Sequence, residues 1–202
     1  MRTVSRLVAV LAALASLFGT PASAQDAPRG LVEVHEGRRA GFWGGLGVGA
    51  GGESFDLQDG AGYNRELYRP TVSVRLGGTV GQHLRLGGEA LAWINAQGGR
   101  TETLSSFLFI AQLYPLSSTG LYLKGGAGFG RNEVDFHDGY GSVGDTGFAG
   151  LLGAGWEMRI GRNLYLNPTV DLVGHTYTSR TGVDYRERLV NFGLGMLFQF
   201  GG

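Results

Sequence analysis

Residues 41–51 read Gly41-Phe-Trp-Gly-Gly-Leu-Gly-Val-Gly-Ala-Gly51, and this stretch decides the fold. Apart from Trp43, its apolar side chains fall on even positions, whereas the odd positions hold glycine. Successive side chains of a β-strand point to opposite faces, so a period of two predicts a strand with two different faces. One face of this strand is apolar and the other is nearly bare of side chains.

The same alternation recurs seven more times, whereas no segment after Gly41 shows a convincing 3.6-residue helical period. The further predicted strands are residues 71–80, 84–95, 106–113, 121–130, 148–159, 164–175 and 190–200. Residues 106–113 are the most ambiguous of them, because both faces carry apolar side chains. Pro168 cannot donate a ladder hydrogen bond, and we expect a local bulge at that position.

The connections between these strands alternate in length. Those at 81–82, 116–120 and 161–162 are short, those at 53–69, 132–145 and 178–186 are long and polar, and 97–101 is intermediate. An even-stranded up-and-down barrel places both termini and its short turns at one end and the longer loops at the other. We therefore predict eight antiparallel strands, closed into a barrel over residues 41–200.

Residues 1–24 are typical of a secretory signal peptide. Met1 to Arg6 contains two arginines and no acid, an apolar run follows from Leu7 to Gly19, and Ala22-Ser-Ala24 forms a cleavage site. The run is too short for a transmembrane helix, which needs about 20 apolar residues. Residues 25–40 are polar, and we expect a flexible periplasmic lead-in there. The short turns should then be periplasmic, with the longer loops facing the exterior.

Composition narrows the classes of function. Glycine fills 38 of 202 positions, but proline only 5, and aromatic residues reach 11%, which fits neither collagen nor disorder. The 17 basic and 17 acidic residues cancel, so nothing predicts a nucleic-acid partner. The absence of cysteine excludes disulfides, thiolate metal sites and a cysteine-linked lipid anchor. No cofactor is expected.

Two classes of barrel have this alternation: soluble lipocalin-like barrels point large apolar side chains inward, and outer-membrane barrels point them at lipid. The apolar set here is nearly free of charge, whereas a water-facing surface would carry lysine and glutamate. Aromatic members of the set lie near predicted strand ends, as interfacial girdles do: Phe42, Phe129, Phe148, Trp156, Phe198 and Phe200. We therefore predict an eight-stranded antiparallel up-and-down transmembrane β-barrel, all-β, that contacts the lipid of a bacterial outer membrane.

The segments Gly41–Gly49, Gln112–Pro115, Leu121–Gly130 and Phe192–Phe200 together resemble the small outer-membrane β-barrel proteins of the OmpA/OmpX-like group. The likeness extends over about residues 40–200. It implies a structural protein, an adhesin or a small pore. It also implies that the last strand is recognised by the outer-membrane assembly machinery through Phe192, Leu194, Met196, Phe198 and Phe200. In the family this signal usually ends on the aromatic residue, whereas here Gly201 and Gly202 follow.

The second face of the strands combines glycine with charged residues. We predict that these form a charge network in the lumen: Arg75, Arg85, Glu89, Lys124, Glu157, Arg159 and Asp171. Arg75 is expected to face Glu89, and Lys124 to pair with Glu157, because an unpaired buried charge is costly. A paired network that fills the lumen is favoured over a gate for small ions, since eight strands leave little open space.

Two segments resemble ligand-binding motifs, one for dinucleotides and one for calcium, but neither matches its motif in full. Gly47-x-Gly49-x-x-Gly52 matches a dinucleotide fingerprint, but a polar loop follows where that motif needs a helix. The loop at 132–145 contains Glu133, Asp135, Asp138 and Asp145, at spacings that match no known calcium loop. The histidines His35, His83 and His137 are scattered and predict no zinc site. No metal site is expected.

Asp171, His175 and Ser179 suggest a catalytic triad. Four residues of strand separate the first two by about 13 Å, too far for the hydrogen bond that a triad requires. Glu187 is expected near His175 instead, if the last two strands pair. Outer-membrane lipid A deacylases have a serine hydrolase site on a small barrel, but their His-x-Ser spacing is absent here. We therefore do not expect an enzyme.

The sequence favours a structural or surface-interaction role for the barrel. The alternatives are a narrow ion-conducting channel and, third, a lipid-modifying enzyme. The sequence names no extracellular partner and no oligomeric state.

Overall fold

The computed structural model describes residues 39–56, 67–136, 141–178 and 184–200. The predicted signal peptide at 1–24 and all but the last two residues of the predicted lead-in at 25–40 lie outside the described residues, so both stay predictions. Within the described ranges, no helix is long and apolar enough to cross a membrane.

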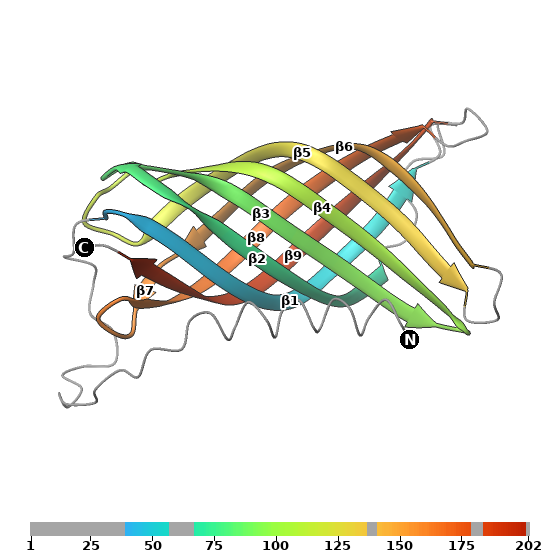
Figure 1. The fold of residues 1–202 in the computed structure, drawn as a ribbon, viewed down its shortest axis with the longest axis horizontal. Helices are drawn as coiled ribbons and strands as arrows, with labels where there is room; N and C mark the ends of the chain where they lie inside the picture. Colours follow the sequence, from blue (N-terminus) through green and yellow to red (C-terminus); the bar gives the residue numbers. More distant parts are fainter. Residues whose placement is uncertain (1–38, 57–66, 137–140, 179–183, 201–202) are drawn as a thin grey trace. The chain divides into compact units, whose positions relative to one another are not determined.

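The described residues form one closed sheet (Figure 1). Its strands are β1 (Phe42–Asp56), β2 (Leu67–Gly81), β3 (Leu84–Gln97), β4 (Arg100–Leu113), β5 (Leu121–Phe136), β6 (Gly141–Trp156), β7 (Met158–Arg159), β8 (Leu164–Thr178) and β9 (Asp184–Phe200). Antiparallel pairing between β1 and β9 closes the sheet. β6 and β7 are two parts of one barrel strand, because both pair with β8 in the same register. The fold is therefore the predicted eight-stranded antiparallel barrel.

The two ends of the barrel have different connections. At the short-turn end, β1 begins, β9 ends, and residues 82–83, 114–120 and 160–163 join neighbouring strands. At the loop end, residues 57–66, 98–99, 137–140 and 179–183 join them. The connection predicted at 97–101 is a two-residue turn, in which Gly98 and Gly99 have φ of 63° and 79°. Positive φ at both central residues is the geometry of the type I′ hairpin turn.

The strands extend further towards the loop end than the sequence indicated. β5 continues to Phe136 and β6 begins at Gly141, so most of the loop predicted at 132–145 is paired strand. The loops predicted at 53–69 and 178–186 are shortened in the same way. In the extension of β5 the outward positions hold Glu133 and Asp135 in place of apolar residues, which removes the apolar alternation by which strands are recognised in a sequence.

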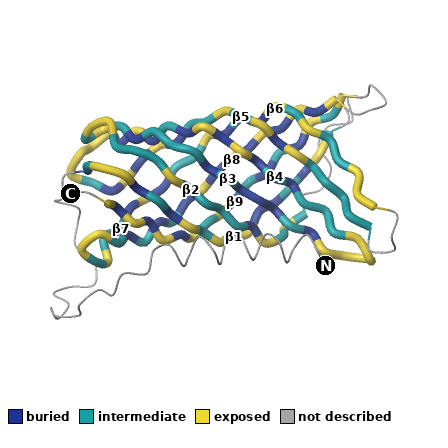
Figure 2. The backbone as a smooth tube through the Cα atoms, in the orientation of Figure 1, coloured by how far each residue is buried: buried dark blue, intermediate teal, exposed yellow. Residues whose placement is uncertain are grey.

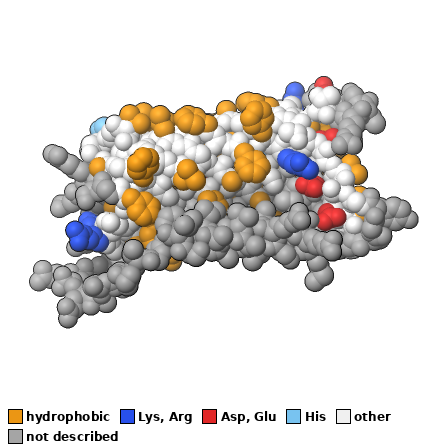
Figure 3. Space-filling model, in the orientation of Figure 1, with side chains coloured by type: hydrophobic (Ala, Val, Ile, Leu, Met, Phe, Trp, Pro, Cys, Tyr) orange, Lys and Arg blue, Asp and Glu red, His pale blue; other side chains and the backbone are white. Residues whose placement is uncertain are grey.

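The predicted lipid face lies on the outside of the barrel. Phe42 is 74% exposed, whereas its neighbour Trp43 points inward and is 2% exposed. In the ambiguous segment, Phe107 is exposed and Leu108 is buried. Figure 2 shows this alternation along the strands, and Figure 3 shows apolar side chains over the middle of the visible surface, with charged side chains towards its ends. An apolar band between polar ends fits the hydrocarbon layer of a membrane.

Pro168 lies in β8 where the pairing of that strand passes from β6 to β7. The predicted bulge is wrong, because the register with β9 continues without a shift through Pro168 and Leu194. Instead, the side-chain Nδ2 of Asn167 donates a hydrogen bond of 2.9 Å to the carbonyl oxygen of Trp156. This side chain supplies a donor beside a residue that has no N–H of its own. The ladder therefore tolerates proline without a change of register.

Inward-facing glycines make room for large aromatic side chains. A Cβ atom built on Gly77 or Gly87 would clash with the carbonyl oxygen of Leu86 or Leu76 and would lie 2.7 or 2.8 Å from Cζ2 of Trp43. The backbone of the neighbouring strand and the indole ring therefore leave no room for a side chain at either position. Gly88, the next residue along β3, points outward, where a Cβ would meet nothing closer than 3.8 Å. The inner glycines are therefore required by packing, whereas Gly88 is not.

The substitution Gly87→Ala should lower the free energy of unfolding by about 1–3 kcal/mol, because the added methyl group overpacks the lumen against Trp43. Gly88→Ala, which adds the same group one residue away, should change it by less than about 0.5 kcal/mol. Urea unfolding of both variants in lipid vesicles, followed by tryptophan fluorescence, measures the difference. Equal unfolding midpoints for the two variants would contradict this packing.

Candidate functional site in the barrel lumen

The inward-facing side chains form four successive groups along the barrel. From the short-turn end, the short-turn cluster contains Arg39, Arg85, Tyr114 and Glu157, and the central cluster contains Arg75, Glu89, Lys124 and Asp171. The apolar layer follows with Leu91, Trp93, Leu104, Leu108, Leu151, Val173 and Leu189. At the loop end, the vestibule contains Glu53, Glu102, Asn132, Asp145, Tyr177, Tyr185 and Glu187.

The short-turn cluster is built on Arg85 of β3. Its Nη1 lies 2.5 Å from Oε1 of Glu157 and its Nη2 donates to Oε1 of Gln199 over 2.8 Å. The hydroxyl of Tyr114 donates to the same Glu157 oxygen over 2.5 Å. Because Arg85 and Gln199 stand on strands that are not neighbours, these bonds cross the lumen.

Arg39, which lies just before β1, also belongs to the short-turn cluster. Its guanidinium group donates to the carbonyl oxygens of Gln82, Ser117 and Thr119 in two different short turns. It also lies 3.8 Å from the centre of the Tyr114 ring and is 2% exposed. Anchored structure therefore begins before residue 41, inside the segment that was predicted to be a flexible lead-in.

The central cluster pairs its charges across the lumen. Nζ of Lys124 lies 2.7 Å from Oε2 of Glu89 and 3.0 Å from Oδ1 of Asp171, on two other strands. Arg75 donates to Oδ1 of Asn167 over 2.7 Å and to the hydroxyl of Tyr122 over 3.0 Å. All of these side chains are buried, so their charges are compensated inside the protein rather than by solvent.

The predicted network is brought together only in part. Arg75 stands opposite Glu89 in the register of β2 and β3, as expected, although its hydrogen bonds go to other residues. The expected pair of Lys124 with Glu157 is wrong, because Lys124 bonds to Glu89 and Asp171 while Glu157 bonds to Arg85. Contacts across a barrel depend on how far each side chain reaches over the lumen, which strand spacing alone does not reveal.

Arg159 does not join either cluster. It is half-buried, and it donates hydrogen bonds to the carbonyl oxygens of Gly161 and Arg162 in the turn after β7. Arg159 is the last residue of β7, so the turn that accepts these hydrogen bonds begins directly after it.

The apolar layer is a feature that sequence reasoning missed. The inner set was read as glycine and charge, yet Leu91, Leu104, Leu108 and Val173 are each at most 4% exposed inside the barrel. Apolar residues on both faces of 106–113 were the signal that an apolar inner region existed. This layer separates the charge clusters from the loop end.

His175 lies just beyond the apolar layer. Its Nε2 is 2.8 Å from Oγ of Ser106, its ring stacks on Tyr177, and Glu187 is its register partner, as predicted. Ser179, the serine considered from the sequence, lies outside the described residues. Ser106 is 1% exposed and His175 2%, so this serine–histidine pair is buried.

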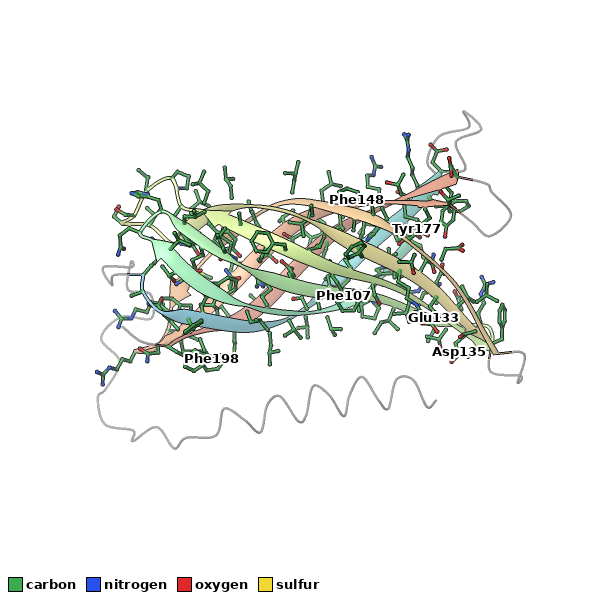
Figure 4. All side chains as sticks on the ribbon, turned by 45° about the horizontal axis from the view of Figure 1, so that its top comes forward. Phe107, Glu133, Asp135, Phe148, Tyr177 and Phe198 are labelled. Atoms are coloured by element: carbon green, nitrogen blue, oxygen red, sulfur yellow. The ribbon has the colours of Figure 1, made fainter. Side chains whose placement is uncertain are left out.

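Two acidic residues of the predicted loop at 132–145 interact with neighbouring side chains. Glu133 pairs with Arg131 over 3.2 Å on the outer surface, and Asp145 accepts a hydrogen bond from Tyr185 over 3.0 Å. Figure 4 labels Glu133 and Asp135 at the loop end, away from Phe198 near the opposite end. Asp138 lies outside the described residues. In the parts of the chain that the structure describes, no group of three or more histidine, aspartate and glutamate side chains is placed to hold a metal ion.

The last strand presents its predicted apolar residues to the outside. The exposed members are Phe192, Leu194, Met196, Phe198 and Phe200, on β9. Their inward neighbours Leu197 and Gln199 are buried. From Phe192 to Phe200, β9 therefore has an apolar outer face and an inner face that points into the lumen, as expected for a transmembrane strand.

A closed eight-stranded barrel with an apolar outer face and charges in its lumen defines the class of transmembrane β-barrels. A family model described as "Outer membrane protein beta-barrel domain" matches residues 10–198 of the chain. The chain therefore belongs to this family, and it is a protein of the bacterial outer membrane. Outer-membrane barrels have short periplasmic turns and longer extracellular loops, so the short-turn end faces the periplasm and the loop end the exterior.

Solved structures support the same fold. Neisserial surface protein A (NspA) superposes with a TM-score of 0.62 at 14% identity, over 82% of this chain and all of that one (100%). Ail, the attachment invasion locus protein of Yersinia pestis, gives a TM-score of 0.49 at 13% identity over 79% of this chain and 99% of its own. A comparison with curated proteins gave no match. At these identities the likeness shows the fold alone.

Removing one of the two cations of the central cluster should destabilise the barrel. Lys124→Met leaves the two buried acids Glu89 and Asp171 with Arg75 as the one remaining cation of the cluster, so the free energy of unfolding should fall by about 3–5 kcal/mol. Arg159→Met removes the same charge from the turn and should change it by less than about 0.5 kcal/mol. Urea unfolding in vesicles gives both values.

Adding Glu89→Gln to Lys124→Met should recover part of the lost stability, because it leaves one acid, Asp171, for the one remaining cation, Arg75. A double variant that is no more stable than Lys124→Met alone would show that Lys124 and Glu89 are not coupled.

Proposed function

We propose that this protein is a non-enzymatic outer-membrane barrel with a structural or surface-interaction role and a lumen closed by its own side chains. The observation that carries the proposal is the set of hydrogen bonds across the lumen. Arg85 reaches Glu157 and Gln199, and Arg75 reaches Tyr122 and Asn167, in each case on strands that are not neighbours. On the loop-end side of these bonds, the leucine and tryptophan side chains of the apolar layer fill the lumen.

A narrow ion channel is the principal alternative. It would need the pairs of Lys124 with Glu89 and of Arg85 with Glu157 to separate, which would leave buried charges without partners. It would also need water to pass the apolar layer, where leucine side chains offer no hydrogen bonds. Both costs favour a closed lumen.

An enzymatic role finds weaker support. The serine–histidine pair of Ser106 and His175 is buried, and Nδ1 of His175 has no hydrogen-bond partner among the described residues, so no acid orients the ring as in a triad. Release of fatty acid from lipid A or phospholipid by the purified barrel would contradict the non-enzymatic proposal.

Planar-bilayer recording tests whether the lumen is closed. Purified, folded protein should give no conductance steps under an applied voltage, while a larger porin in the same bilayer serves as the positive control. Reproducible unitary steps from the barrel would overturn the closed-lumen proposal and favour the channel.

The partners that we propose are the surrounding lipid and, during biogenesis, the outer-membrane assembly machinery. The exposed aromatic residues of β9 support the second, with Phe200 as the last of them. Phe200→Ala should lower the amount of folded protein in the outer membrane, because it removes the terminal aromatic residue of the signal. Removing Gly201 and Gly202 should leave that amount unchanged. Immunoblots of unheated membrane fractions measure both, and equal losses would refute the assignment.

A further inference from the structure

A groove opens on the outer face of the barrel along β3, which lies between β2 and β4 in the sheet (Figure 1). In two successive rows of the register, a small residue of β3 stands between larger side chains of its neighbours: Leu76, Gly88 and Phe109, then Val74, Ala90 and Phe107. These six residues line a cavity of about 470 Å³, which we call the β3 groove. A Cβ atom built on Gly88 would meet nothing closer than 3.8 Å, so the floor of the groove is open.

The walls of the β3 groove stand out from the barrel. Leu76, Phe107 and Phe109 are 63%, 59% and 64% exposed. All three point away from the lumen into the apolar band that contacts the hydrocarbon layer. What fills the groove in the membrane is therefore apolar.

The β3 groove has the width of one extended hydrocarbon chain. Neighbouring strands lie about 4.8 Å apart, so the backbones of the two walls are separated by about 10 Å. The wall side chains take part of that width, and carbon atoms in contact are about 4 Å apart. An α-helix with its side chains is about 10–12 Å across, which is too wide to enter. The groove therefore fits an acyl chain and not a transmembrane helix.

Packing, rather than the hydrophobic effect, favours a chain in this groove. Lipid tails are as apolar as the groove itself, so a chain that moves into it from the bilayer removes no further surface from water. On a smooth part of the outer face, a chain touches protein on one side. In the groove it touches β3 beneath it and a wall on either side, and many weak contacts add up.

The β3 groove opens towards the extracellular leaflet. At its periplasmic end, the next outward residue of β3 is Leu86, which occupies the line of the floor. Towards the loop end, the floor continues with Ala92, and the β4 wall ends at Phe107 because the next outward residue is Ser105. A chain that leaves the groove on this side enters the extracellular half of the membrane.

Polar and basic side chains mark the membrane surface at this opening. Ser105 is followed on the outer face of β4 by Thr103 and Thr101, and its register partner on β5 is Arg131. The Arg131 side chain is 55% exposed, and its Nη2 lies 3.2 Å from Oε2 of Glu133. Exposed ion pairs contribute little, whereas a bond from arginine to phosphate is charge-assisted and strong. A lipid phosphate can therefore take Arg131 from Glu133.

We propose that the β3 groove binds one acyl chain of lipid A, the phosphorylated glycolipid of the extracellular leaflet, with a phosphate of the same molecule beside Arg131. The shape of the groove selects the chain, its open end selects the leaflet, and Arg131 selects the charge. A phospholipid of the periplasmic leaflet would have to enter past Leu86. The inference rests on the lipid partner proposed above and names one lipid and one site for it. It does not depend on whether the lumen is closed.

Native mass spectrometry of the full-length, folded protein tests the proposal. The barrel is reconstituted in vesicles of phosphatidylethanolamine that contain a minor fraction of lipid A, and is then extracted in mild detergent. One lipid A molecule should stay bound to each barrel, at higher occupancy than phosphatidylethanolamine. Gly88→Leu fills the floor and should lower the affinity for lipid A about fivefold or more.

Gly125→Leu is the matched control. It adds the same side chain to an outward glycine of β5, where a Cβ would meet nothing closer than 3.9 Å, and it should leave lipid A binding unchanged. A second pair of variants replaces the first if Gly88→Leu folds poorly. Phe109→Ala removes part of a wall and should also weaken lipid A binding, whereas Phe148→Ala removes an equally exposed phenylalanine from β6 and should not.

Three results would overturn the proposal. They are wild-type protein that retains no lipid A, equal retention of phosphatidylethanolamine, and equal losses of lipid A in Gly88→Leu and Gly125→Leu. The same spectra report the oligomeric state, and a wild-type dimer that Gly88→Leu dissociates would show that a second copy, not lipid A, occupies the groove. Conductance measurements concern the lumen alone, so a failure of the closed-lumen proposal is distinguishable from a failure of this one.

Discussion

Every other feature of this protein depends on the closure of its backbone hydrogen-bond ladder between β1 and β9. In hydrocarbon no water is present to bond to a free N–H or C=O group, and each unpaired group costs several kcal/mol. The register from Phe42 opposite Phe200 to Asp56 opposite Arg186 removes the sheet edge along the whole height of the barrel. Closure at eight strands then sets a narrow interior, which has to be filled by side chains.

The narrow interior explains why glycine and large side chains occur together. Trp43 covers Gly77 and Gly87, and the Tyr122 ring lies where a Cβ on Gly155 would be. The narrow lumen also determines where charges can be buried. Lys124 and Arg85 are buried because acidic side chains on other strands reach them across the lumen. The vestibule is the exception: its carboxylates have no cationic partner among the described residues, which sets it apart from the clusters below.

The sequence predicted what local periodicity controls. Eight strands, their apolar outer face and their antiparallel order all follow from a period of two and from the positions of short turns. What it could not predict depends on contacts across the lumen or on the polar ends of strands. The Lys124–Glu89 pair joins strands that are not neighbours, and Arg39 is anchored by turns more than 40 residues away in sequence. Asn132–Phe136 forms paired strand although its outward positions hold the acids Glu133 and Asp135. The apolar layer had one sequence signal, the apolar inner face of residues 106–113.

The most direct test of a closed lipid-facing barrel is the electrophoretic mobility of the protein from isolated outer membranes, with and without boiling in detergent. A closed barrel keeps its backbone bonds in cold detergent and migrates as a compact species, whereas boiling unfolds it. The account predicts that the protein is recovered in the outer-membrane fraction and that its band shifts on boiling. Recovery as a soluble periplasmic protein whose band does not shift would contradict it.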